Sequence, residues 1–127
     1  ANLENPKSFA EVAFAVVPIQ SLSSSDAFAH ELGHLMGVGH VDDPQTSEYS
    51  VAYRQTDPES PCGYWSTIMD GDAAGAAHAR ILYWSNAQKD ILLCGQSMGE
   101  ADRVDNARTL NETADKIASF SCLIGDQ

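Results

Sequence analysis

The pattern of hydrophobic and polar positions predicts a strand near the start of the chain and a helix at its end. Residues 12–19 form a short apolar run with paired β-branched side chains and a proline near its close, which is typical of a strand. Between residues 101 and 123, apolar or small side chains recur at steps of three and four, which predicts an amphipathic helix. Its expected inward face consists of Val104, Ala107, Leu110, Ala114, Ile117, Ala118 and Ser121.

A second helix is predicted over residues 27–36. Ser25 and Asp26 are both good N-cap residues, and Gly37 stands where the chain needs a residue that readily adopts a positive φ. Gly33, inside this helix, costs helix stability of roughly 1 kcal/mol. We therefore expect another segment to pack closely against this glycine.

The segments between the predicted helices have a less regular pattern of apolar and polar residues. Residues 38–75 are punctuated by prolines and glycines and keep neither a period of 2 nor one of 3.6, which predicts a long loop. A loop of this length in a small domain usually serves a function or is tied down by something other than packing. We expect a short helix near residues 76–82 and a glycine-rich turn over residues 94–99.

Composition and charge are those of a small globular domain. The chain has 127 residues, enough for one domain with a modest core, and no apolar stretch near the roughly 18 residues that a membrane helix needs. Seven basic against eighteen acidic residues give a net charge of −11. This charge repels phosphate backbones, so we expect no nucleic acid as partner. Because no apolar stretch approaches membrane length, we expect no membrane as partner either. Three cysteines, Cys62, Cys94 and Cys122, allow at most one disulfide within the chain, with the pairing open.

The strongest chemical signal lies in the predicted central helix and the turn after it, where residues 30–40 read His-Glu-x-x-His-x-x-Gly-x-x-His. His30 and His34 are four positions apart, so both imidazoles project from one helix face, with Cβ atoms about 5–6 Å apart. Each ring can then lie roughly 2.0–2.1 Å from one zinc ion. Gly37 lets the chain leave the helix and turn back, so that His40 completes a site of three histidines.

The number of ligands in this pattern bears on its chemistry. Three protein ligands leave a fourth position for water, which distinguishes a catalytic zinc from a closed structural one. Glu31 follows the first ligand directly and lies on the helix flank that faces the open position. We expect it to act as general base toward the zinc-activated water and then as the acid that protonates the leaving amine. The pattern therefore predicts one catalytic Zn²⁺ per chain.

The motif resembles that of the metzincin zinc peptidases, whose second hallmark is a tight turn that carries a methionine beneath the metal. Residues 66–70, Ser-Thr-Ile-Met-Asp, match that turn, with Met69 placed 29 residues after the third histidine. Later segments, at residues 84–86, 95–99 and 105–114, are similar to the reprolysin-like (adamalysin-related) enzymes, especially the bacterial ones.

This resemblance implies an α+β fold and a function. We expect residues 1–127 to form a single, partial metzincin-like catalytic domain, with a zinc helix, a Met-turn loop and a C-terminal helix. Most of the family's N-terminal sheet is missing, and a further segment or a second chain is expected to supply it. The implied activity is that of a secreted zinc-dependent endopeptidase with a protein or peptide substrate. Met69 would shape the floor under the histidines without binding zinc.

Two alternatives stay open. A non-catalytic interaction module derived from the metzincin fold would keep the zinc and lose turnover. Glu31 argues against it, because a retired enzyme has little physical need for a general base beside the metal. A structural zinc domain would need a fourth protein ligand, and Cys62 or Cys94 is the candidate.

Overall fold

The computed structural model describes residues 13–17, 19, 26–71 and 78–119, and within these ranges the chain forms two helices and two small sheets. The α+β class predicted from the sequence is confirmed. None of the described helices is long and apolar enough to cross a membrane. The elements, in chain order, are α2 Ala27–Leu35, β1 Arg54–Gln55, β2 Trp65–Ser66, β3 Ala79–Arg80, β4 Leu92–Leu93, β5 Gln96–Ser97 and α3 Asn106–Ala118.

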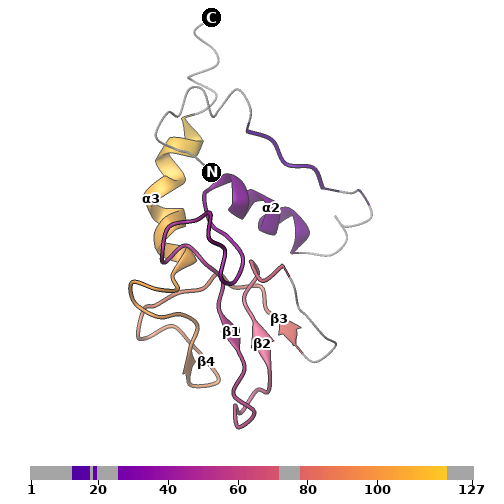
Figure 1. Ribbon diagram of the computed structural model, residues 1–127, viewed down its shortest axis with the longest axis vertical. Helices are drawn as coiled ribbons and strands as arrows, with labels where there is room; N and C mark the ends of the chain where they lie inside the picture. Colours follow the sequence, from indigo (N-terminus) through magenta and orange to yellow (C-terminus); the bar gives the residue numbers. More distant parts are fainter. Residues whose placement is uncertain (1–12, 18, 20–25, 72–77, 120–127) are drawn as a thin grey trace, which may run out of the picture.

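The larger sheet has the order β1-β2-β3 and lies below α2 in Figure 1, with α3 beside α2. β1 pairs antiparallel with β2, and β2 pairs in parallel with β3. β4 and β5 form a separate antiparallel hairpin whose two-residue loop has positive φ at Cys94 (51°) and Gly95 (77°). The turn predicted over residues 94–99 is therefore confirmed only at residues 94–95, because Gln96 and Ser97 form β5.

A small apolar core lies where the two helices meet the segment after β2. Its buried members are Val38, Ala52, Ile68 and Met69, and Met69 is fully buried, with 0% of its surface exposed. Ala29 of α2 and Leu110 of α3 are among the half-buried side chains that pack against this cluster. The core therefore fixes the zinc-motif helix relative to the segment that carries Met69.

Helix α2 matches its prediction to within one residue at its end. Asp26 occupies the N-cap position, as one of the two expected caps. Its side chain makes no capping hydrogen bond and instead accepts one from Arg80 Nη1 of β3 at 2.9 Å. The aspartate therefore joins the start of the helix to the sheet.

Helix α3 begins later than the predicted residue 101. Glu100 and Val104 bond to each other through both backbone groups, at 2.9 and 2.8 Å, and close a turn in which Asp102 has φ 59°. The helix starts only beyond this turn, where the Asp105 side chain caps it by accepting from Arg108 N at 3.1 Å. Residues 120–123 lie outside the described part of the chain.

The inward face of α3 also differs from the predicted apolar stripe. Its buried residues are Asn106, Thr109 and Thr113, while Ala114 is exposed. The Thr113 hydroxyl donates to the carbonyl oxygen of Met36, the C-cap of α2, at 2.9 Å. This bond to α2, together with bonds of Thr109 and Asn106 to Ser50 and Ser85, gives α3 a polar inward face that the periodicity of apolar residues does not predict.

Three further predictions are wrong in part. Residues 13–17 and 19 form no strand, because no described segment pairs with them; residues 12 and 18 lie outside the described part. The loop predicted over residues 38–75 contains β1 and β2. Near residues 76–82, where the sequence predicts a short helix, the described portion contains β3, because Ala79 N and Ile81 N donate to the carbonyl oxygens of Tyr64 and Ser66 at 3.2 and 2.8 Å.

Candidate metal centre

The end of α2 turns the chain back toward the helix face that carries His30 and His34. Gly37 has φ 93°, the left-handed conformation that glycine adopts at little cost. Its N–H donates to the carbonyl of His34 at 3.1 Å, and the N–H of Val38 donates to the carbonyl of Gly33 at 3.1 Å. These two bonds form a Schellman motif, which satisfies carbonyl groups at the helix end. The predicted role of Gly37 as the exit from the helix is confirmed.

The backbone around His40 is fixed by the neighbouring segment. Gly39 N donates to Ser50 O at 2.8 Å, and Ala52 N donates to Gly39 O at 3.2 Å. A side chain at Gly39 would collide with Thr46 and Asp43, since an added Cβ would lie 2.5–2.7 Å from their atoms. Close packing of this turn therefore directs the His40 ring toward α2.

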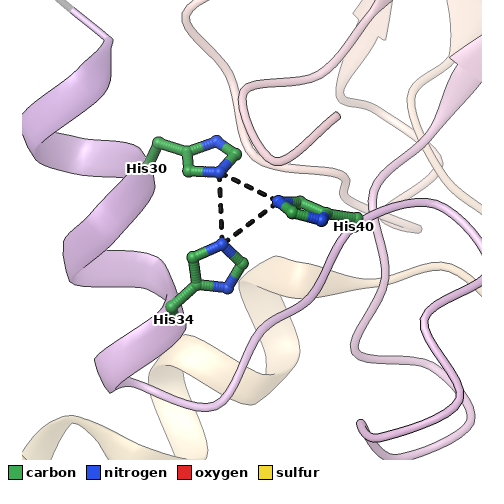
Figure 2. Close-up of side chains that lie close together, drawn as sticks. All are labelled: His30, His34 and His40. Carbon is green, nitrogen blue, oxygen red and sulfur yellow. Dashed lines mark hydrogen bonds between the residues drawn. The ribbon is translucent and has the colours of Figure 1, made fainter. Parts of the chain in front are cut away.

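The three histidine rings converge on one point through their Nε2 atoms, as Figure 2 shows. Nε2 of His30 lies 3.2 Å from that of His34 and 3.1 Å from that of His40, and the His34–His40 separation is also 3.1 Å. These three residues are the only group of three or more potential ligand side chains that meet in the described part of the chain. The structure thus brings together all three ligands predicted from the sequence.

The opposite ring nitrogens of the two helical histidines are held by backbone carbonyls. His30 Nδ1 lies 2.8 Å from Ile68 O, and His34 Nδ1 lies 3.1 Å from Val38 O. A carbonyl oxygen only accepts, so each Nδ1 carries the proton and each Nε2 of the neutral ring has a free lone pair. The contact between these two Nε2 atoms therefore lacks a hydrogen. Two lone pairs that face each other at this distance favour a cation between them.

A zinc ion fits this donor set. Donors in a tetrahedral shell at roughly 2.0–2.1 Å from zinc lie about 3.3 Å from one another, close to the separations of 3.1 and 3.2 Å observed here. Neutral imidazole is a common zinc ligand, and a carbonyl that holds its Nδ1–H is a typical outer partner. Three such ligands would leave one position of the tetrahedron open.

Electrostatics at the centre favour the form of His34 that can bind a metal. Burial lowers the pKa of His34 below the ordinary value of histidine, and the nearby rings of His30 and His40 lower it further. The backbone hydrogen bond to Val38 and the charge of Glu31 act in the opposite direction. The net effect stabilises the neutral, metal-binding ring at neutral pH.

Met69 lies beneath the helical part of the centre. It occupies a tight turn in which Asp70 N donates to Thr67 O at 3.0 Å. A Cβ added to Gly33 would lie 2.7 Å from Met69 Sδ and 2.8 Å from Trp84 Cζ3. The close approach expected from a glycine inside α2 is therefore confirmed, and Met69 is one of the side chains that make it.

The turn that carries Met69 is tied firmly to β1. Arg54 holds both carboxylate oxygens of the buried Asp70, one of them through Nε at 2.8 Å. The Thr67 hydroxyl accepts from Tyr53 N at 2.9 Å. Such a bidentate pair and backbone bond fix the turn, and with it the Ile68 carbonyl that orients His30.

Two contributors to the centre were missed by reasoning from the sequence. Gly71 packs on the third histidine of the group, since an added Cβ would lie 2.7 Å from His40 Nε2. Ile68 contributes through its carbonyl oxygen, a group that every residue has. The glycine directly after Met69 and Asp70 was the available signal for the first, whereas nothing in the side chain of Ile68 marks the second.

Glu31 is half-buried on α2, directly after His30. The negative charge of its carboxylate partly opposes the lowering of the His34 pKa, so Glu31 contributes to the electrostatics of the centre. It is not among the side chains that converge with the three histidines. Glu31 therefore lies outside the group of converging side chains, and its catalytic role stays a prediction.

The cysteines bear on the alternative of a structural zinc site. Cys62 and Cys94 form a disulfide across 32 positions of sequence, which joins the β1–β2 connection to the β4–β5 hairpin. A disulfide sulfur offers no thiolate to a metal. Neither of the two cysteines considered as a fourth ligand therefore serves as one in this structure, while Cys122 lies outside the described residues.

The described part of the chain is thus a small α+β protein with a three-histidine centre suited to an open zinc site. By sequence it is similar to proteins named peptidyl-Asp metalloendopeptidase. Identity is 37% over 115 residues and 36% over 116 residues with those of two strains of Stenotrophomonas maltophilia, and 36% over 115 residues with that of Xanthomonas campestris.

The alignments include most of this chain but only a small part of each relative's length. Each alignment includes 89% of the present chain, which in turn spans 26–27% of the length of the curated relatives it matches. No family model matches the chain, and no solved structure matches it. The comparisons therefore link the region of the metal centre to metalloendopeptidases and leave the activity of the whole protein to be tested.

Proposed function

We propose that this chain carries the catalytic zinc centre of a metalloendopeptidase, with one Zn²⁺ held by Nε2 of His30, His34 and His40. The observation that carries the proposal is the convergence of the three Nε2 atoms, which lie 3.1–3.2 Å apart. In two of the rings, those of His30 and His34, the Nδ1 proton is already donated to a backbone carbonyl, so Nε2 is free to bind a metal. The similarity to proteins named as metalloendopeptidases supports the same conclusion.

The roles of the protein's own groups follow from the site. Zinc, when bound, supplies a lowered pKa for water and polarises a carbonyl. The Glu31 carboxylate takes a proton from the attacking water and delivers it to the nitrogen of the departing amine. The Ile68 and Val38 carbonyls hold the two helical rings in the required tautomer, and Met69 supports their helix from below.

The substrate in this proposal is a protein or peptide with an aspartyl residue at the cleavage site. The relatives at 36–37% identity are named for peptidyl-Asp substrates, and their similarity extends over 89% of this chain. We extend that preference to the present protein. A reprolysin-like relationship within the metzincins remains part of the proposal, supported by residues 30–40 and 66–70.

We also propose that the protein is secreted. The Cys62–Cys94 disulfide supports it, because disulfides persist mainly in oxidising environments outside the cytosol. Retention of Glu31 beside the histidines favours an enzyme over a zinc-containing interaction module that has lost turnover.

Replacement of Glu31 by glutamine tests the catalytic role. Glu31→Gln keeps the shape of the side chain and removes the base, so we expect unchanged zinc content and a fall in peptide hydrolysis of ~10²–10⁴-fold. Glu59→Gln, a change at an exposed acid in the β1–β2 connection, is the matched control and should retain the parent rate. A Glu31→Gln protein that hydrolyses peptide as fast as the parent would refute the assignment.

A further inference from the structure

One face of the β2–β3 pair gathers side chains that donate hydrogen bonds. The parallel register pairs Ser66 with Arg80, so these two side chains project from the same face of the sheet. His78 precedes Arg80 by two residues and shares that face, because successive side chains of a strand alternate. The Tyr64 ring lies 5.4 Å from the His78 ring, centre to centre, and borders the same surface.

The donors on this face lack acceptors. Ser66 is fully buried, with 0% of its surface exposed, and its hydroxyl has no hydrogen-bond partner among the described residues. Arg80 Nε and both ring nitrogens of His78 are likewise buried and unpartnered within that part of the chain. Buried donors without acceptors cost stability. Three of them side by side, on residues of three different types, indicate a site for a ligand that accepts several hydrogen bonds.

The charge of Arg80 makes a carboxylate the fitting ligand. Arg80 donates to Asp26 through Nη1 at 2.9 Å, whereas its Nε–H has no acceptor among the described residues. Two other arginines use more of their donors on carboxylates: Arg54 binds both oxygens of Asp70, and Arg108 binds Asp102 and Glu112. A chain with net charge −11 repels acidic peptides in general, so an acidic substrate side chain needs a local cation.

The face lies beside the metal centre. Asp26, the partner of Arg80, accepts from His30 N at 2.8 Å and so occupies the helical turn that precedes the first ligand. Two residues beyond β2, Ile68 holds the His30 ring through its carbonyl. Figure 1 shows β2 and β3 next to each other below α2. Asp26 and the segment that follows β2 therefore link this face directly to His30 of the metal centre.

We propose that the face formed by Ser66, His78 and Arg80 binds the side-chain carboxylate of an aspartyl residue in the substrate peptide. Arg80 Nε–H, the Ser66 hydroxyl and one N–H of His78 donate to the two carboxylate oxygens. This inference rests on the proposed peptidase function and assigns its aspartyl preference to particular side chains. The three are specificity residues and take no part in proton transfer.

The test compares two peptides that differ only by Asp or Asn at the cleavage site, both amidated at the C-terminus so that the side chain is the only variable carboxylate. With the full-length zinc-loaded protein, kcat/KM should favour the Asp peptide by about tenfold or more. Arg80→Gln should reduce this ratio to near one, mainly by slowing cleavage of the Asp peptide. Arg103→Gln, a matched loss of an exposed arginine that pairs with exposed Glu100, should keep the parent ratio.

Two further variants guard against a simple loss of folding. Asp26→Asn breaks the same ion pair as Arg80→Gln but leaves the guanidinium in place, so the preference for Asp should survive. Ser66→Ala removes an unpartnered buried hydroxyl, so the thermal midpoint without peptide should stay the same or rise while the Asp preference falls several-fold. A preference that is unchanged in both Arg80→Gln and Ser66→Ala overturns the inference.

Binding separates failure of this inference from failure of the proposed function. Affinity of the zinc-loaded Glu31→Gln protein for the two peptides is measured by fluorescence polarisation of a labelled peptide. Tighter binding of the Asp peptide, lost in Arg80→Gln, supports the carboxylate site even if the parent hydrolyses neither peptide. Equal affinity for both peptides overturns the site, whether or not the parent cleaves them.

Discussion

At Gly33 the absence of one methyl group decides how closely α2 approaches the turn below it. An added Cβ would lie 2.7–2.9 Å from atoms of Met69, Trp84 and Val38. Alanine gains about 1 kcal/mol of helix propensity over glycine, whereas overpacking of a core costs about 1–3 kcal/mol. We expect the overpacking to exceed the gain, so that Gly33→Ala lowers the free energy of unfolding by up to about 2 kcal/mol in urea titrations.

A double-mutant cycle provides the control for this prediction. Met69→Ala removes the sulfur that lies nearest the new methyl group, so Gly33→Ala should be less costly, or even stabilising, in that background. Stabilisation by Gly33→Ala in the parent would contradict the close packing of α2 on Met69.

The lowered pKa of His34 predicts a dependence of stability on pH in the zinc-free protein. The unfolded chain takes up a proton at the ordinary histidine pKa of about 6.5, whereas burial and the neighbouring rings oppose protonation in the folded state. The unfolded state therefore binds more protons as the pH falls below about 6.5, and the free energy of unfolding decreases there. Urea titrations in the presence of a chelator should show this decrease, and His34→Gln should reduce it; an unchanged profile in His34→Gln would argue against the burial of this ring.

The sequence alone predicted that the three histidines converge, because their spacing of four and six positions indicates a helix face followed by a return turn. It could not predict Gly71 on the His40 ring or the Ile68 carbonyl on His30 Nδ1. Both are backbone features whose position depends on how the segment after β2 folds back against α2. Groups that orient ligands through the backbone leave little trace in side-chain composition.

At the scale of elements, predictions held where the signal was local and failed where it depended on a neighbour. Helix α2 has its cap position and terminal glycine in the sequence, and its limits agree with the prediction. The strand predicted over residues 12–19 is absent from the described positions, since apolar β-branched composition does not supply a strand to pair with. Helix α3 turns a different face inward from the one predicted, because the hydroxyls of Thr113 and Thr109 form buried hydrogen bonds that a pattern of apolar residues does not indicate.

The disulfide between the β1–β2 connection and the β4–β5 hairpin should be a major source of stability. Closing a loop of 32 positions restricts the unfolded chain by about 3–4 kcal/mol in the chain-entropy treatment. The double variant Cys62→Ser/Cys94→Ser should lose about that much in the free energy of unfolding, yet bind one zinc per chain as before. Cys122→Ser is the control for loss of a thiol; loss of zinc in the double variant would revive the structural-zinc alternative.

At the scale of the whole molecule, several apolar side chains near the start of the chain are exposed to solvent. Phe14, Val16 and Ile19 are each 75–76% exposed, and the chain spans about a quarter of the length of its curated relatives. We propose that a further segment or a second chain covers these side chains, because exposed apolar side chains that lie close together are typical of a surface that another segment buries. Light scattering of the 127-residue chain alone should therefore show self-association that Phe14→Ser/Val16→Ser reduces; a clean monomer would count against this cover.

The central claim is that three histidines hold a zinc ion with one position open, and X-ray absorption at the zinc edge tests it most directly. Protein purified without added zinc should contain about one equivalent, with nitrogen or oxygen neighbours at roughly 2.0–2.1 Å and no sulfur shell. His40→Ala, which removes one of only three ligands, should weaken zinc binding sharply, whereas His78→Ala should not. A protein that takes up no zinc even when it is supplied, or one whose zinc has sulfur at about 2.3 Å, would contradict the account.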